Sequence, residues 1–336
     1  MRAYQAFRSP PIMGALAAAV GVVVLASSCG GGSDTPDPTV ATIDSAGVTS
    51  AINDFGGVVG ICKQTTSSST LRTQRKLVMA QAMRVAMQAA AQPQRADTKT
   101  RLALGSTPPA DSLGSCGGRS GYRNYSHVNG VTTATLSFEN YCSLDSSTGE
   151  KQFIDGSIAF VDTATPTASG PVTTQMTADT SRAVTLVVQT ATGAPVSSQT
   201  MNFSGFKMVV GVPGGTPTAS SPNVMSLSDM TVKDNDTGKS YRESNYQLKQ
   251  YETPAGNTEM TFSGRGYRSN GSTFDIVTTQ PVAQNGDGNV VGGAITFTGA
   301  NGSNAVATMV PGPEMQATLT VNGVAVTSVP ECKVGK

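Results

Sequence analysis

The sequence is poor in the residues on which most catalytic centres depend. Its 336 residues include one histidine, His127, and no tryptophan. Most zinc hydrolase centres use two or more imidazole ligands, so the composition excludes them. Charged residues make up 13% of the chain, about half the share usual in globular proteins. With 23 lysines and arginines against 22 aspartates and glutamates, the chain also lacks the positive field that binds a nucleic-acid backbone.

The N-terminus has the pattern of a targeting segment. Arg2 and Arg8 precede an uncharged apolar run over Ile12–Ala26, which suits the core of a signal peptide and falls short of the roughly 20 residues of a spanning helix. The run ends in Leu25-Ala26-Ser27-Ser28-Cys29-Gly30, which resembles the bacterial lipoprotein signal. This resemblance implies a signal peptide over residues 1–28 and fatty acylation, for example with palmitate, of Cys29. The alternative is an ordinary cleavable signal in which Cys29 has no such role.

The residues after Cys29 are typical of a flexible tether, which we place over residues 29–44. They begin with Gly30–Pro38, a polar stretch rich in glycine and proline. Several acyl chains on one residue would anchor the protein durably, because each buried methylene contributes about 0.8 kcal/mol. In lipoproteins of diderm bacteria, aspartate after the acylated cysteine signals retention in the inner membrane. Gly30 therefore implies the outer membrane, with the domain facing the periplasm or the cell surface.

Four further cysteines predict two disulfides in an exported chain: Cys62, Cys116, Cys142 and Cys332. A turn helps to pair them, because Asn129-Gly130 is a strong two-residue hairpin signal. Residue numbers paired across this hairpin sum to 259, and 116 plus 142 is 258. One bulge, for which Gly117 and Gly118 are suited, would bring these two cysteines onto the same face. We therefore predict Cys116–Cys142 and Cys62–Cys332.

Residues 45–115 differ in character from the rest and are expected to form a helical segment and a connector. The stretch 71–92 contains neither glycine nor proline, and its apolar residues recur at helical spacing. They form two adjacent stripes: Val78, Ala82, Val85 and Ala89, and Met79, Met83, Met87 and Ala90. Pro93 ends the pattern. This helix is expected to pack against a sheet; the alternative is a helix that lies on the membrane or accepts varied apolar partners.

From residue 116 to 336 the pattern is typical of an antiparallel β domain. Short runs rich in valine, threonine and aromatic residues alternate with Gly, Asn and Asp turns. Ala134, Leu136 and Phe138 share one face of their strand, and Val184, Leu186 and Val188 share one face of another. The fold class expected is mainly β: an antiparallel meander that forms a curved sheet or open barrel, with one packed N-terminal helix over about 71–92. Strands are expected over Tyr122–Val128, Val131–Tyr141, Phe153–Val161, Val184–Val188, Met201–Val210, Met225–Lys233, Ser240–Tyr251, Glu259–Tyr267, Ser272–Thr279, Gly292–Thr298, Ala305–Val310, Gln316–Val321 and Val324–Val329.

The second half of the chain carries a progression of short motifs. Gly-Arg-Gly-Tyr begins at Gly264, Thr-Thr-Gln-Pro at Thr278, and a Gly-Ala-Ile-Thr-Phe-Thr-Gly run at Gly293 that leads to Ser303. In this it is similar to β-rich lipoproteins of proteobacteria, a resemblance that implies the fold class and no activity.

Candidate catalytic groups are few. His127 could act as the base of a serine hydrolase, but no Gly-x-Ser-x-Gly motif supports this, and an exposed strand histidine is the simpler interpretation. Paired carboxylates could hydrolyse glycosides. The candidates are Glu139, Asp155, Asp229, Glu243, Glu252, Glu259 and Asp275. The absence of tryptophan, which commonly stacks on sugar rings, disfavours that chemistry.

Two acidic, glycine-rich runs were considered as calcium loops. Asp234–Gly238 begins like one, but the position that requires glutamate holds Asn245, and Asn285–Asn289 is a second acidic, glycine-rich turn. Hairpin turns explain both runs, so no metal or other cofactor is expected. The function predicted is a lipid-anchored envelope protein, not an enzyme, with a binding or scaffolding role. Its partners would be the membrane, through the N-terminal lipid, and an apolar small molecule or an envelope protein. The alternatives are a structural or adhesive surface module and, more weakly, a carboxylate-based hydrolase.

Overall fold

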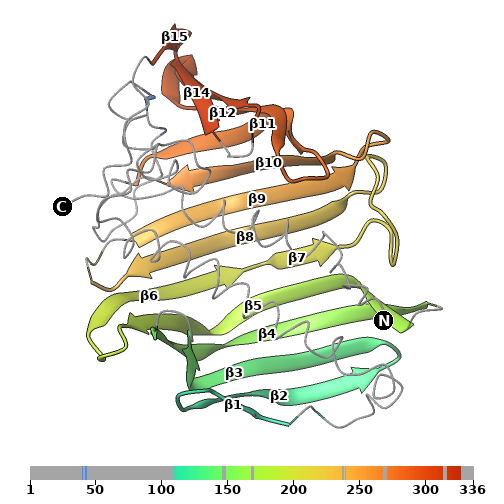
Figure 1. Ribbon diagram of the computed structural model, residues 1–336, viewed down its shortest axis with the longest axis vertical. Coiled ribbons are helices and arrows are strands. Elements are labelled where there is room, and N and C mark those ends of the chain that lie inside the picture. Colours follow the sequence, from blue (N-terminus) through green and yellow to red (C-terminus); the bar gives the residue numbers. More distant parts are fainter. Residues whose placement is uncertain are drawn as a thin grey trace, which may run out of the picture.

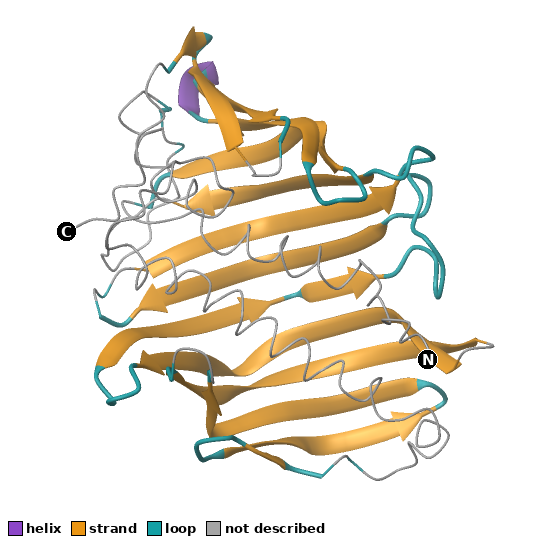
Figure 2. Cartoon of the chain, in the orientation of Figure 1, coloured by secondary structure: helices purple, strands orange, loops and turns teal. Residues whose placement is uncertain are grey.

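The chain folds into one large antiparallel sheet. The computed structural model describes Val40, residues 42–43, Pro108 and residues 110–145, 149–167, 170–236, 238, 240–267, 271–312 and 316–326. Within these residues the regular structure is all strand, apart from a single 3-10 turn, η3 (Ala300–Gly302) (Figure 2). The expected helix over 71–92 lies outside the described residues, as do Cys29, Cys62, Cys332 and the predicted signal peptide.

Fifteen strands make up the sheet. They are β1 (Ser112–Leu113), β2 (Arg119–Val128), β3 (Val131–Leu144), β4 (Lys151–Thr167), β5 (Gly170–Gln189), β6 (Pro195–Ser204), β7 (Phe206–Val209), β8 (Asn223–Asp234), β9 (Ser240–Glu252), β10 (Thr258–Tyr267), β11 (Thr273–Gln284), β12 (Val290–Thr298), β13 (Asn304–Val310), β14 (Gln316–Val321) and β15 (Val324–Ala325). The sheet therefore begins at Ser112, slightly before the predicted start of the β domain at residue 116.

The topology is a meander in which each strand pairs with the next along the chain (Figure 1). The one departure is β7, which continues the line of β6 and lies between β5 and β8. Asn129 and Gly130 both adopt positive φ in the tight turn between β2 and β3, which confirms the predicted hairpin. Consecutive pairing of this kind confirms the antiparallel meander and leaves the sheet open, with β1 and β15 as its outermost described strands.

One face of the sheet is buried, and we call it the inner face. In β3 the side chains of Ala134, Leu136 and Phe138 are at most 2% exposed, whereas Val131 on the other face is 36% exposed. The alternation predicted for Val184–Val188 is also confirmed. The inner face carries a continuous apolar core from β3 to β14, and the outer face is rich in threonine and serine.

A series of β-bulges interrupts the ladder near the middle of the strands. Register shifts occur beside Asn140 in β3, Gly156 in β4 and, against β10, Asn245 in β9, and each of these residues has positive φ. Gly205, with φ +64°, separates β6 from β7 at a comparable position. Bulges bend a strand and increase its twist. We attribute the curvature of the sheet to this series.

Several strand predictions differ from the structure: β4 runs on to Thr167 and β11 to Gln284, whereas the strand expected over Val324–Val329 ends at Ala325. The expected strand over Met201–Val210 is broken at Gly205 into β6 and β7. Only Val184–Val188 was predicted within β5, but the strand begins at Gly170. Its first half is dominated by threonine and other polar residues, so hydrophobic alternation gives a weak signal there.

Candidate functional site

Methionine side chains form a row across the centre of the inner face. Met176 of β5 pairs in register with Met208 of β7, which pairs with Met225 of β8. The row continues through Leu248 of β9 to Phe262 of β10. Methionine is unbranched and polarizable, so its side chain adapts to apolar partners of different shapes. This methionine row is an adaptable apolar stretch of the inner face.

Polar groups without hydrogen-bond partners lie beside the methionine row. Asn223 of β8 and Gln250 of β9 face each other in the ladder, two residues along from the pair of Met225 and Leu248 and on the same face. Both side chains are 5% exposed. The Asn223 Oδ1 atom accepts the N–H of Gly211 at 3.1 Å, but in the described part of the chain no partner meets Asn223 Nδ2 or Gln250 Oε1. A donor and an acceptor are thus buried side by side.

Tyr246 adds a third such group on the same strand as Gln250. Its side chain is 7% exposed, and its hydroxyl has no partner among the described residues. Burial raises the pKa of this phenol well above its usual value, and the charge of Glu243 raises it further. Each buried polar group left unsatisfied costs about 1–3 kcal/mol. Such groups call for an explanation, such as an ordered water or a ligand.

Glycines on β10 make room for the aromatic rings of this region. A Cβ atom at Gly264 would lie 3.2 Å from the Tyr246 ring, and one at Gly266 would lie 2.6 Å from the Phe274 ring. The inner face of β10 is therefore bare at two successive inward positions, and neighbouring rings fill the space.

The single histidine lies on the inner face near the β2–β3 turn. His127 is half-buried, and its Nδ1 atom lies 2.8 Å from Thr132 Oγ1. Asp162 of β4 pairs with Thr132 in the ladder. Burial raises the pKa of the Asp162 carboxyl, while a hydrogen bond from Thr173 and the charge of His127 oppose this shift. The prediction of an exposed histidine is therefore wrong, because the register set by the Asn129-Gly130 turn pairs His127 with Thr132, which lies on the inner face.

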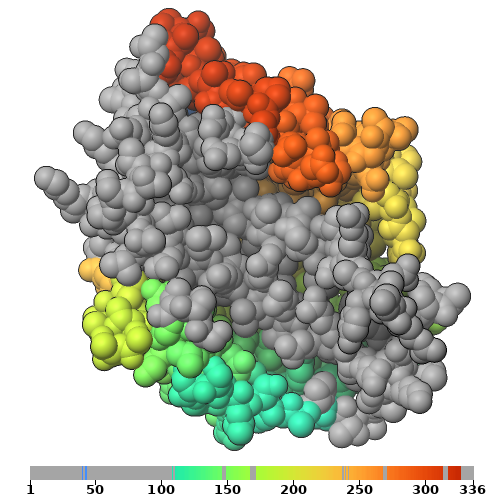
Figure 3. All heavy atoms as spheres, in the orientation of Figure 1, coloured from blue at the N-terminus to red at the C-terminus, as the bar shows by residue number. Residues whose placement is uncertain are grey.

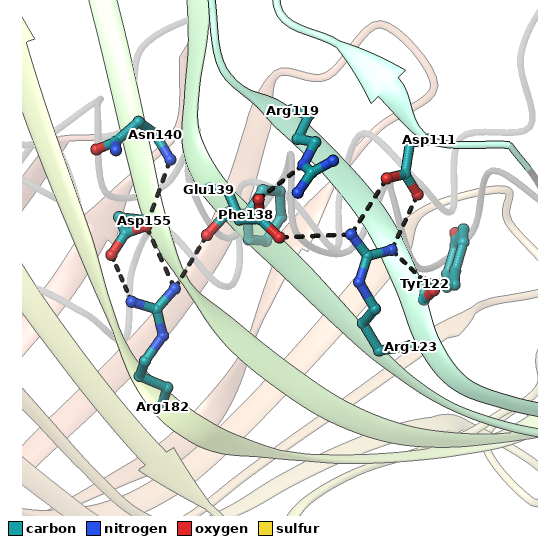
Figure 4. Close-up of polar contacts among 9 residues, drawn as sticks. All are labelled: Asp111, Arg119, Tyr122, Arg123, Phe138, Glu139, Asn140, Asp155 and Arg182. Carbon is teal, nitrogen blue, oxygen red and sulfur yellow. Dashed lines mark hydrogen bonds and ion pairs between the residues drawn. The ribbon is translucent and has the colours of Figure 1, made fainter.

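The charged residues of the outer face form a network over β1–β5 (Figure 4). Arg123 makes two contacts with Asp111, at 2.9 and 3.1 Å, and Arg119 contacts Glu139 at 2.7 Å. These bonds lower the pKa of both Asp111 and Glu139. All four side chains are substantially exposed, so the pairs contribute little net stability.

Arg182 ties this network to the bulges of β3 and β4. It binds Asp155 at 2.6 and 3.2 Å and the carbonyl of Phe138 at 3.1 Å (Figure 4). The same carboxylate accepts the N–H of Asn140 at 3.3 Å. Three arginines thus face three carboxylates, which leaves the network without net charge. Its chemistry suits holding the bulged strands together.

The predicted carboxylates are mostly held one by one. Arg242 binds Asp229, Arg265 binds Asp275, and the Tyr251 hydroxyl donates to Glu259. Glu139 and Asp155 both belong to the arginine network, where Arg119 binds Glu139 and Arg182 binds Asp155. The two runs that were candidates for calcium loops form turns, in which the side chains of Asp234 and Asn285 accept hydrogen bonds from backbone N–H groups. Within the residues that the structure describes, no group of three or more His, Cys, Asp or Glu side chains is arranged to hold a metal.

The first predicted disulfide is present on the outer face. Cys116 is bonded to Cys142, with their Cα atoms 5.1 Å apart. The register shift lies between Arg123 and Ser126, at Asn124, and not at the glycines beside Cys116 where we predicted it. From there to Arg119 the paired numbers sum to 258, which carries the two cysteines opposite each other.

A comparison with protein-family models, with curated proteins and with solved structures finds no match. The described residues also contain no helix long and apolar enough to cross a membrane.

The candidate site is the methionine row with its three buried polar groups. Sequence reasoning missed Asn223, Tyr246 and Gln250, although period-two alternation with Met225, Leu227 and Leu248 places all three on the inner face.

Proposed function

We propose that this protein is a lipoprotein of the bacterial cell envelope that binds an apolar ligand and catalyses no reaction. Acyl chains on Cys29 would anchor it to the outer membrane, with the sheet facing the periplasm or the cell surface. The lipoprotein-like signal at residues 25–30 supports this cellular location. The bond between Cys116 and Cys142 supports an oxidising compartment, where disulfides persist.

The observation that carries the binding role is the pair Asn223 and Gln250. A buried donor and a buried acceptor that find no partner among the described residues lie next to a row of adaptable methionines. The ligand they suit has a long apolar body and one polar group that both accepts and donates a hydrogen bond, such as an amide. Leaving these atoms unpaired costs free energy that such a ligand would restore.

The proposal includes the N-terminal helix of the predicted fold. The helix over residues 71–92 would pack against the sheet through its alanine and methionine stripes. A purely structural or adhesive role is the competing proposal. It draws support from threonine ladders on the outer face, where Thr185 meets Thr200 at 3.3 Å and Thr279 meets Thr296 at 3.1 Å.

Native mass spectrometry of the full chain, purified from a diderm host with small molecules retained, tests the ligand. We expect a bound lipid-like molecule. The variant Met208→Gln should raise the dissociation constant about tenfold, which corresponds to a loss of about 1.4 kcal/mol of apolar contact, and so lower the bound fraction. Lys207→Gln, at the exposed neighbouring position, is the matched control and should leave binding unchanged. An empty protein, or equal binding by both variants, would favour the structural role.

Metabolic labelling with a fatty acid tests the anchor separately. The native chain should incorporate the label and sediment with outer membranes, and Cys29→Ala should do neither. Labelling that survives this substitution would contradict the assignment of Cys29.

A further inference from the structure

The chain is fixed to the far end of the sheet just before residue 44. The N–H of Ile43 donates to Ser303 Oγ at 2.8 Å, and its carbonyl accepts a bond from Asn322 Nδ2 at 3.2 Å. Upstream, Val40 bridges Thr273 of β11 in parallel. The Ile43 side chain is 2% exposed and belongs to the core of the inner face. Ile43 therefore lies on the inner side of this end of the sheet.

The chain is fixed again at the opposite end of the sheet after residue 107. Asp111 binds Arg123 of β2, and Ser112 pairs with Ser120. In Figure 3 the first strands (teal) and the last strands (red) lie at opposite ends of the molecule. Between β2 and β13 the path along the sheet has ten strand-to-strand steps, or about 48 Å at roughly 4.8 Å each. Residues 44–107 must bridge this distance.

The length of this segment suits the crossing. A helix over 71–92 would cover about 33 Å at 1.5 Å per residue. The 27 residues before it and the 15 after it supply the remainder.

The inner face requires a covering layer of matching chemistry. Its core side chains are at most 9% exposed, yet the described residues supply a single sheet and no second layer. Residues 44–107 carry eight lysines and arginines against three aspartates, whereas residues 108–336 carry 13 basic against 17 acidic side chains. Glu243, 5% exposed, places a carboxylate on the inner face itself. The segment thus brings both an apolar stripe and positive charge.

We propose that residues 44–107 lie across the inner face from β13–β14 to β1–β2 and form the second layer of the fold. The occupant of this face is then the protein's own chain and not a second copy or a partner protein. Met79, Met83 and Met87 would meet the methionine row, so the proposed ligand would lie between two methionine-rich layers. The proposal stands on the two points of attachment and on the charge, and a protein without ligand would leave it intact.

Site-specific photo-crosslinking tests the arrangement. Phe262, on the inner face of β10, is replaced by p-benzoyl-phenylalanine in the full chain, and Tyr251, on the outer face of β9, is the matched aromatic control. We expect position 262 to crosslink to peptides from 44–107 of the same chain, and position 251 to give none of these products. Mixing isotopically light and heavy chains distinguishes crosslinks within one chain from crosslinks between two copies. Light–heavy products at 262, or products only from other proteins, would overturn the proposal.

Photo-methionine incorporated into the native sequence provides a second measurement that does not depend on the folding of a variant. Crosslinks should join peptides containing Met79, Met83 or Met87 to peptides of β5–β10. Crosslinks confined to pairs of strands would overturn the proposal as well.

Discussion

At the scale of single residues, Gly156 illustrates how the bulges depend on glycine. Its φ is +136°, and a Cβ atom there would lie 2.6 Å from the carbonyl oxygen of Ala183 and 2.7 Å from the Cα of Val184. We expect Gly156→Ala to lower the free energy of unfolding by about 2–3 kcal/mol, through backbone strain and close contact with β5. Denaturant titration of the purified variant measures this loss.

Gly292 provides the control for that substitution. It also lies in a strand, but its φ is not in the left-handed region and a Cβ atom there would meet nothing within 4 Å. Gly292→Ala should leave stability unchanged or raise it by about 0.5 kcal/mol, because alanine restricts the unfolded chain. Equal losses in both variants would show that the bulge of β4 does not need glycine.

Asp162 makes stability depend on pH in a defined direction. Burial raises the pKa of its carboxyl in the folded protein above the ordinary value of 3.8. The folded state therefore holds this proton more tightly than the unfolded state, and its contribution to stability is lost as pH rises from the unfolded pKa through the folded one. We expect Asp162→Asn to raise the melting temperature more at pH 7 than at pH 3.5. A difference from the native protein that does not change with pH would contradict the role of burial.

At the scale of elements, the β2–β3 hairpin shows both the reach and the limit of sequence reasoning. The Asn129-Gly130 turn fixes where the strands pair, because both positions need positive φ. The pairing of Cys116 with Cys142 followed from that register. The position of the bulge at Asn124 did not follow from the turn. The inward orientation of His127 was missed, although the turn register pairs it with buried Thr132.

The disulfide of this hairpin is expected to be its main stabiliser. It closes a loop with a sequence separation of 26. In the chain-entropy model, a loop of that size contributes about 3 kcal/mol by restricting the unfolded state. The double variant Cys116→Ala and Cys142→Ala should lose about this amount in denaturant titration. Arg265→Gln, which removes an exposed ion pair with Asp275, is the comparison and should have a much smaller effect.

At the scale of the whole molecule, the sequence predicts the class of fold better than its site. Period-two alternation and Asn-Gly turns predict an antiparallel meander, and the structure confirms it. The candidate site depends instead on long-range register. Met176, Met208 and Met225 form a row only because β7 inserts between β5 and β8. No local pattern in the sequence indicates that insertion.

The positions of Ile43 and Val326 lead to a prediction for the second disulfide. The carbonyl of Ile43 is bound by Asn322 Nδ2, beside β14, and the N–H of Val326 donates to Leu319 within β14. The chain toward Cys62 and the chain toward Cys332 therefore both start from the same corner of the sheet. Cys116 and Cys142 are already bonded to each other at the opposite end. We expect a non-reduced digest of the mature protein to contain one peptide pair joined through Cys62 and Cys332, which separates on reduction. A peptide joining Cys62 to Cys116 would contradict both this pairing and the hairpin register from which it follows.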